Sequence, residues 1–250
     1  MIQDPVFYLL AVPAVVLLGF SKGGLAGVGS LALPLIVIVI EPVQAAAIML
    51  PILIAQDTVG VWAFRRHLDW YVLGWTVPGA TFGILLGYLF AANVPSAAVM
   101  ALVGVISIAF GAYRLWLRRQ GTPKAAAPSS PGWIGSLFGV ASGFTSQIAH
   151  AGAPPFQLWV LPRRLPRDVL VGTSAVYFAV INWIKVPAFA ALGQFSATNV
   201  LTAAALLPVA IVSTFAGVWL VRRIDGERFY AIIYCLMIVV GVILLFEAAA

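Results

Sequence analysis

The chain has 250 residues, of which 62% are hydrophobic and only 9% are charged. Because about a quarter of the residues of a soluble domain are normally charged, this composition excludes a soluble globular protein. The formal net charge of +6 does not indicate nucleic-acid binding, since nearly all Lys and Arg residues stand in short connections between apolar stretches. Cys235 is the single cysteine, which excludes an intramolecular disulfide and a zinc-binding cysteine pattern.

Eight apolar stretches follow one another along the chain. A helix of about 20 apolar residues is long enough to cross a bilayer, and the stretches show no alternation of apolar and polar residues. The sequence therefore predicts an all-α integral membrane protein. The stretches cover residues 6–40, 43–64, 70–92, 97–117, 133–161, 169–191, 200–221 and 229–246.

The chain divides between the fourth and fifth stretches. Residues 118–131 are rich in Lys, Arg, Ala, Pro and Ser, a composition typical of a flexible linker. We therefore predict a first transmembrane repeat at 1–117, a cytoplasmic linker at 118–131 and a second transmembrane repeat at 132–250.

The two halves share an order of glycine and proline residues, which indicates an internal repeat. Three Gly or Pro residues of the first half have a residue of the same type 120 positions later, and three more have one 130 positions later. The first set is Gly19, Gly23 and Pro34, matched by Gly139, Gly143 and Pro154; the second is Pro78, Gly87 and Gly111, matched by Pro208, Gly217 and Gly241.

Basic clusters predict how the repeats are oriented. Arg and Lys residues follow the second, fourth, fifth and seventh stretches, and such clusters favour the cytoplasmic side. The fifth stretch then starts and ends on the cytoplasmic side, so it must enter and return as a hairpin. By the repeat, the first stretch does the same from outside. We expect two inverted repeats in the cytoplasmic membrane, each with a Gly-rich broken or re-entrant hairpin followed by three transmembrane helices.

The predicted hairpin tips lie at residues 21–30 and 142–155. Glycine permits a sharp reversal, and non-helical backbone at membrane depth survives only where it is buried or lines a cavity. The free N–H groups of a helix that starts there attract anions. Close packing of helices through small residues is the alternative explanation for the glycines.

Four ionisable residues lie deep in apolar stretches, where each is a functional candidate: Lys22, Asp57, His150 and Lys185. Asn182 shares a helical face with Lys185, three residues away. The alternative for either lysine is that it reaches the headgroup region. With two lysines and one aspartate, the interior is neutral to positive, which favours an anionic substrate.

Polar neighbours extend this set. Gln147 and Gly23–Gly24 belong to the predicted tips, so we include them with Lys22, His150, Asn182 and Lys185 as substrate-binding candidates. Asp57 and Gln56 are candidates for a coupling site or proton relay, although Asp57 alternatively just neutralises a lysine. No Cys or carboxylate stands at metal-site spacing from His150, so we predict no metal site and no cofactor.

Three motifs resemble the TauE/SafE family of sulfite and organosulfonate transporters. They are Gly19-Phe20-Ser21-Lys22-Gly23-Gly24-Leu25-Ala26-Gly27-Val28-Gly29 through Pro34, His150-Ala151-Gly152-Ala153-Pro154-Pro155, and Asn182-Trp183-Ile184-Lys185-Val186-Pro187. The resemblance covers essentially the whole chain. It implies transport of sulfite, sulfoacetate or a similar small anion. One departure is Gly27-Val28-Gly29-Ser30, where family members often carry three consecutive glycines.

We therefore expect a secondary transporter that moves a small anion by alternating access, and not an enzyme. An anion channel with the same site is the first alternative. A membrane-embedded enzyme with Ser146 and His150 is the second, and it lacks an obvious carboxylate beside them. The sequence leaves proton or sodium coupling and a homodimer open, along with the exact substrate and its direction.

Overall fold

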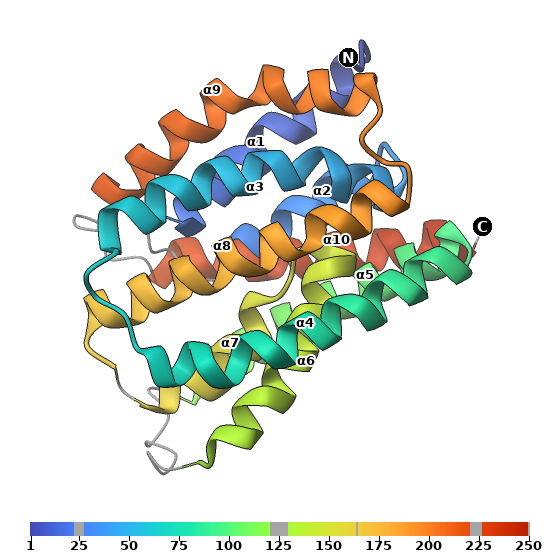
Figure 1. Cartoon of the computed structure of the whole chain (residues 1–250). Helices are drawn as coiled ribbons and strands as arrows, with labels where there is room; N and C mark the ends of the chain where they lie inside the picture. The colour runs from blue at the N-terminus through green and yellow to red at the C-terminus, as the bar shows by residue number, and fades with distance from the viewer. Residues whose placement is uncertain (23–27, 121–129, 164, 221–226, 250) are drawn as a thin grey trace.

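The computed structural model describes residues 1–22, 28–120, 130–163, 165–220 and 227–249 (Figure 1). Within these ranges the chain is helical, with no strand. The first half contains α1 (Pro5–Lys22), η1 (Val28–Leu31), α2 (Ala32–Val37), α3 (Pro42–Phe64), α4 (Trp70–Asn93) and α5 (Ser96–Arg119). The second half contains α6 (Gly132–Ala149), α7 (Ala153–Val160), η2 (Leu161–Arg163), α8 (Arg167–Ala191), α9 (Ala197–Leu220) and α10 (Glu227–Ala249).

Local sequence signals explain several helix boundaries. Pro42 occupies the first turn of α3, where a missing N–H breaks no helical hydrogen bond. The Asp69 carboxylate caps α4 by accepting a hydrogen bond from the Val72 backbone N–H at 3.0 Å. Just beyond α8, Gly193 adopts a φ of 68°, a left-handed conformation that glycine tolerates best.

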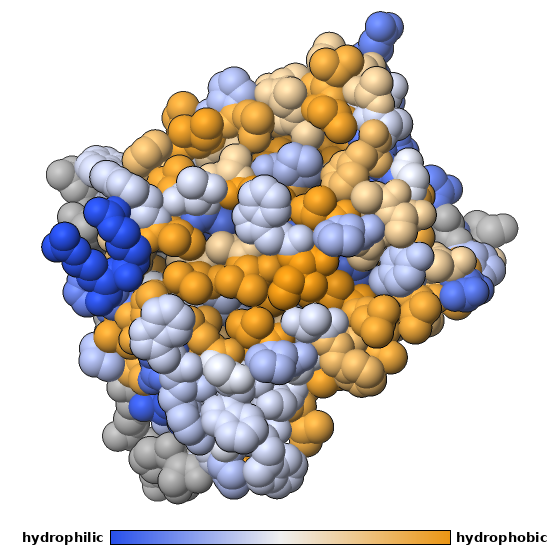
Figure 2. Space-filling model, in the orientation of Figure 1, coloured by the Kyte–Doolittle hydropathy of each residue, from blue (hydrophilic) through white to orange (hydrophobic). Residues whose placement is uncertain are grey.

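The long helices fit a membrane environment. Six helices of the described ranges are long and apolar enough to span a bilayer, and they include α1, α3, α4, α8 and α9. Large apolar side chains such as Leu9, Phe82 and Phe215 are exposed, and an apolar surface covers much of the face shown in Figure 2. A soluble protein would not expose so much apolar surface. The chain is therefore a multi-pass membrane protein.

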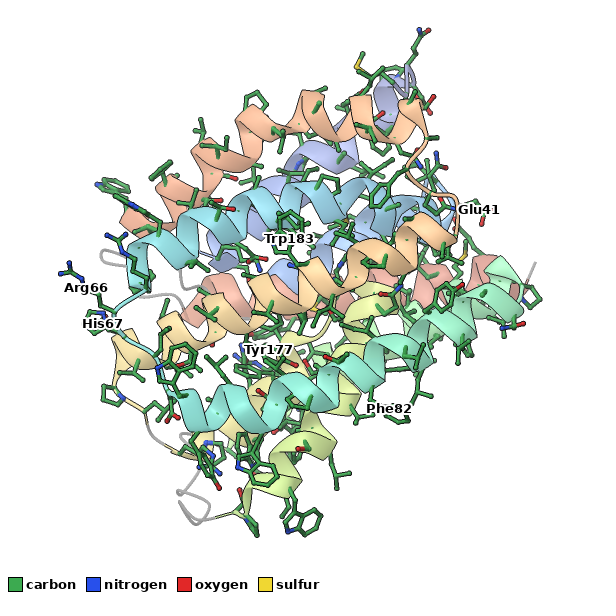
Figure 3. All side chains as sticks on the ribbon, viewed as in Figure 1. Glu41, Arg66, His67, Phe82, Tyr177 and Trp183 are labelled. Atoms are coloured by element: carbon green, nitrogen blue, oxygen red, sulfur yellow. The ribbon has the colours of Figure 1, made fainter. Side chains whose placement is uncertain are left out.

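Charged residues separate to opposite ends of the bundle. Arg66 and His67 lie at one end and Glu41 at the other (Figure 3). At the first end the Arg163 guanidinium stacks 5.0 Å from the Tyr71 ring centroid, and Thr173 accepts a hydrogen bond from the Asp69 backbone N–H. We call this end, with Arg65, Arg66 and Arg163, the basic end.

The other end carries no Lys or Arg in the segments that reach it, residues 1–4, 38–44 and 191–199. Its contacts join the N-terminus to the starts of two helices. Thr202 accepts a hydrogen bond from the Ile2 backbone N–H, and Gln44 donates to Asn199 at 2.9 Å. We call this end, with Asp4 and Glu41, the acidic end.

The first and fifth apolar stretches each turn back on themselves, as expected. Arg163, directly after α7, donates to the Ser130 carbonyl just before α6 at 2.8 Å, so the α6–α7 pair starts and ends at the basic end. The first stretch begins at Ile2 and returns to Gln44, both at the acidic end. The arms are unequal, however: α1 and α6 have 18 residues each, whereas the returning α2 and α7 have 6 and 8.

Glycines bring helices of opposite halves into backbone contact. A Cβ added at Gly83 of α4 would collide with the Val140 carbonyl of α6, and one at Gly19 of α1 would collide with Ser213 of α9. In α5 and α10, Gly104 and Gly241 each approach the other's carbonyl oxygen, where an added Cβ would lie 2.8 and 2.7 Å away. The repeated glycines thus serve packing between helices.

Packing between the halves dominates the fold. Helix α4 packs along α6, α9 along α1, α5 along α10, and α3 along α8 (Figure 1). Each of these pairs joins one helix that ends by residue 119 to one that starts at residue 132 or later. The two halves therefore interleave, and α3 with α8 crosses the centre between the two hairpins.

The glycine contacts lead to a stability prediction. Gly83→Ala should lower the free energy of unfolding by about 1–3 kcal/mol, because its Cβ meets α6 backbone that cannot move aside. Gly74→Ala on the same helix is the control, since nothing lies within 4 Å of its added Cβ. Thermal unfolding in detergent measures both. Equal stability of the two variants would contradict the assigned α4–α6 contact.

Candidate functional site

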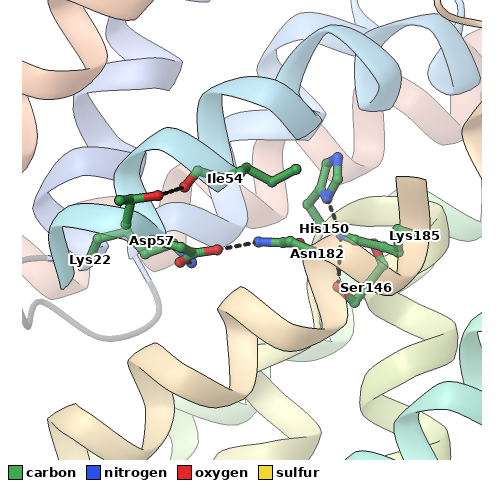
Figure 4. Close-up of polar contacts among 8 residues, drawn as sticks. Lys22, Ile54, Asp57, Ser146, His150, Asn182 and Lys185 are labelled. Atoms are coloured by element: carbon green, nitrogen blue, oxygen red, sulfur yellow. Dashed lines mark hydrogen bonds and ion pairs between the residues drawn. The ribbon is translucent and has the colours of Figure 1, made fainter. Parts of the chain in front are cut away.

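The four deep ionisable residues come together around one cavity. It has a volume of about 220 Å³ and is lined by Lys22, Asp57, His150 and Asn182, among others. Lys22 ends α1, Asp57 lies in α3, His150 follows α6 and Asn182 lies in α8. Both hairpins and both central helices therefore contribute to its wall (Figure 4).

One side of the cavity is a chain of polar contacts centred on Asp57. The Lys22 ammonium forms an ion pair with Oδ1 of Asp57. The Asn182 amide donates to Oδ2 of Asp57 at 2.6 Å (Figure 4). The Lys22 ammonium also lies 5.0 Å from the centre of the Phe178 ring, a cation–π distance. Each carboxylate oxygen of Asp57 thus contacts one donor, and the Lys22–Asp57 pair has no net charge.

The other side is organised by Lys185, whose side chain is fully buried. Its Nζ donates to Oγ of Ser146 at 3.1 Å and to the Ser146 carbonyl at 3.3 Å. It also lies 2.8 Å from Nδ1 of His150 (Figure 4). Asn182 and Lys185 share the inner face of α8, whereas Trp183 between them points outward and is exposed (Figure 3).

The His150 ring has a defined tautomer in this arrangement. An ammonium group has donors only, so a protonated Lys185 requires Nδ1 of His150 as the acceptor. The proton then resides on Nε2, which donates to the Ala46 carbonyl of α3 at 2.8 Å. The backbone of His150 is left-handed, with a φ of 48°, and it caps α6. The bend therefore aims the ring between α3 and α8.

The charges around the cavity do not cancel. Among the residues that the structure describes, the one ion pair is Lys22 with Asp57, and Lys185 contacts only neutral groups. An uncompensated charge buried in a membrane protein is strongly unfavourable. A protonated Lys185 therefore gives the cavity wall one positive charge that an anion can neutralise.

Hydrogen-bond donors face the cavity at the same place. Because Oγ of Ser146 accepts from Lys185, its own hydroxyl hydrogen is free to donate to a ligand. Lys22 retains two N–H groups beyond its contact with Asp57, and the Asn182 amide retains one. The arrangement suits an oxyanion with several acceptor oxygens.

The cavity extends from His150 toward the basic end. Gly60, one turn before the end of α3, and Leu170, in the first turn of α8, both line it. Gln157 of α7 does so as well. Toward the acidic end, His150 and its contact with Ala46 close the cavity.

The structure separates the predicted site residues into three groups. Lys22, His150 and Asn182 line the cavity, and Lys185 lies directly behind its wall. Gly23 and Gly24 fall outside the described residues. Gln147 is buried but lines a different, much smaller pocket.

The two coupling candidates also separate. Asp57 lines the cavity, whereas Gln56 points away from it, with Nε2 3.4 Å from the carbonyls of Val15 and Ala210. Gln56 thus connects α3 to α1 and α9.

Sequence reasoning did not include Ser146 in the binding set. Its signal is its position one helical turn before His150, which places both residues beside Lys185. Its hydroxyl makes the direct contact between the buried ammonium and the cavity. The described residues contain no cluster of three or more His, Cys, Asp or Glu side chains able to hold a metal.

Comparison with known families identifies the chain. Residues 11–244 match the family described as Sulfite exporter TauE/SafE, which covers nearly the whole chain. The chain belongs to the TauE/SafE family. No curated protein and no solved structure matched it. The TauE/SafE match spans both hairpins, α3 and α8, and the family is one of transporters, so a role in membrane transport follows.

The Lys22–Asp57 pair yields a prediction on stability. Asp57→Asn should destabilise the protein by about 3–5 kcal/mol, because it leaves the Lys22 ammonium without its counter-ion in a largely buried place. The double variant Lys22→Met with Asp57→Asn should be less destabilised than the sum of the single variants, because neither charge is then left alone. Thermal unfolding of the four proteins completes the cycle. Additive effects would contradict the pairing.

Proposed function

We propose that the chain is a secondary transporter that moves sulfite or a related small organosulfonate across the cytoplasmic membrane by alternating access. The observation that carries this proposal is the buried Lys185, which has no acidic partner among the described residues and lies behind a cavity lined with donors. Membership of a sulfite exporter family supports the same class of substrate.

The size of the cavity supports a small substrate. Pockets for drug-sized ligands usually occupy about 300–1,000 Å³. At about 220 Å³, this cavity suits an ion such as sulfite or sulfoacetate with few accompanying waters. In our proposal the sulfur-bound oxygens accept hydrogen bonds from Ser146, Asn182 and Lys22, and Lys185 supplies the compensating charge through Ser146 and His150.

The orientation follows from charge. We propose that the basic end faces the cytoplasm, because Arg and Lys residues favour that side. The α6–α7 hairpin would then enter from the cytoplasm and the α1–α2 hairpin from outside, as two inverted repeats require. The reciprocal pairs α4 with α6 and α9 with α1 support this relation. The cavity, which extends to the basic end, would be loaded from the cytoplasm.

A carrier explains the closed end better than a channel does. Beyond His150 the cavity does not continue toward the acidic end, so an anion cannot diffuse straight through this conformation. We propose that movement of the hairpins against α3 and α8 exposes the site to the other side. A channel would instead need a continuous path in its conducting state.

We propose Asp57 as the site where a coupling ion, a proton or sodium, binds. Both of its oxygens are occupied, by Lys22 and Asn182. A proton or cation that binds Asp57 reduces the negative charge that holds Lys22 and Asn182, and so changes the cavity wall. In this proposal Gln56 contributes indirectly, because it fixes the part of α3 that carries Asp57.

The proposal predicts the effect of removing the buried charge. Lys185→Met should weaken sulfite binding at least about tenfold, because a charged hydrogen-bonding group is lost. Arg66→Gln is the control, since it removes one positive charge from an exposed loop away from the cavity. Binding is measured by titration of purified protein, and transport by counterflow of labelled sulfite in liposomes.

The same measurements can contradict the proposal. If correctly inserted Lys185→Met protein binds sulfite and exchanges it as the parent does, Lys185 does not supply the charge for the anion. If the parent binds neither sulfite, sulfoacetate nor taurine, the substrate class is wrong. Flux without counterflow, accompanied by large unitary currents, would indicate a channel.

A further inference from the structure

Gln147 is a buried amide whose polar atoms find no partner. Its side chain is 2% exposed, and neither its Nε2 nor its Oε1 has a hydrogen-bond partner among the described residues. It lines a pocket of only about 10 Å³, whose other walls are apolar side chains and backbone. Burial of an unpaired amide is unfavourable, and more so where lipid replaces water around the protein.

Packing alone does not explain this residue. On α4, Gly87 leaves the space that Gln147 fills, because an added Cβ there would lie 2.8 Å from the Gln147 Cβ. A leucine of similar size would fill that space without burying polar atoms. Buried polar groups of native proteins nearly always have a hydrogen-bond partner, so an unpaired one needs an explanation.

The small pocket lies next to the cavity, with His150 between them. Ala46, whose carbonyl accepts the Nε2–H of His150, lines the small pocket. Phe189 also lines it and stacks on the His150 ring at a centroid distance of 6.3 Å. The imidazole therefore has the cavity and Lys185 on one side, and Ala46, Phe189 and the small pocket on the other.

The small pocket also lies on the acidic-end side of His150. Val43, at the start of α3, and Leu192, just past the end of α8, both line it. The cavity, by contrast, extends toward the opposite ends of the same two helices. The two spaces thus lie one after the other along α3 and α8.

We propose that Gln147 is a second binding position for the transported anion, used when the pathway opens toward the acidic end. Its two amide N–H groups donate to oxygens of the small oxyanion after it has passed His150. Separation of His150 from Ala46 and Phe189 joins the small pocket to the site. This inference rests on the proposed function, because it takes the cavity as the place where the anion first binds.

The first test separates binding from turnover. Gln147→Leu should keep the affinity of the cavity for sulfite within about twofold, since Gln147 does not line it, and should lower the rate of counterflow at least about tenfold. Its thermal stability should equal or exceed that of the parent, because the unpaired amide is gone. Thr76→Val on α4, a buried polar side chain outside both spaces, is the control and should keep parental turnover.

A second measurement does not depend on the folding of Gln147→Leu. In a Cys235→Ser background, Gln147→Cys should react with a membrane-impermeant thiol reagent added outside intact cells, and sulfoacetate, which does not consume the reagent, should slow the reaction. Ser174→Cys, in the cavity wall toward the basic end, is the matched control and should react from the cytoplasmic side.

Each outcome has a separate meaning. Parental counterflow by Gln147→Leu, or reaction of Gln147→Cys only from the cytoplasmic side, overturns the second position while leaving the cavity intact. A parent protein that does not bind sulfite overturns the proposed function itself.

Discussion

The fold is organised around a buried lysine. Lys185 lies in the membrane helix α8, six residues before its end at Ala191, and its side chain is fully buried. Its contacts are the neutral groups of Ser146 and His150. The second interior lysine, Lys22, is neutralised by Asp57. When Lys185 is protonated, one positive charge is left without a counter-ion among the described residues, and we propose that an oxyanion supplies it. The unfavourable burial of this charge and the affinity for an anion have the same physical origin.

Interleaving of the two halves keeps these groups together. The cavity takes residues from α1 and α3 before the linker and from α6, α7 and α8 after it. Glycines at the α4–α6 and α1–α9 contacts let backbones touch, so each hairpin is held by a helix of the other half. The site therefore lies between elements of both halves, which is where the proposed alternating access requires it.

Much of this was predictable from sequence, because the bilayer restricts the choices. Length and apolar character identified the helices within a few residues, and the basic clusters required the fifth stretch to return. Burial of an ionisable residue in an apolar stretch is unfavourable, and this identified Lys22, Asp57, His150 and Lys185 as candidate site residues. Sequence could not show that Lys22 pairs with Asp57, or that Gln147 lies beyond His150, because these depend on the rotation of each helix about its axis. Sequence also could not show how long each arm of a hairpin is, and α1 and α6 exceed their partners α2 and α7 in length.

The most direct test is to locate the anion. Selenite is a pyramidal oxyanion like sulfite. Anomalous scattering from its selenium atom would mark the position of the bound ion in crystals of the protein. We expect one peak within the cavity, at hydrogen-bonding distance from Ser146 and Asn182, and its loss in Lys185→Met. A peak confined to the arginines of the basic end, or a cavity peak of full occupancy in Lys185→Met, would contradict the assignment of Lys185 as the charge that holds the anion.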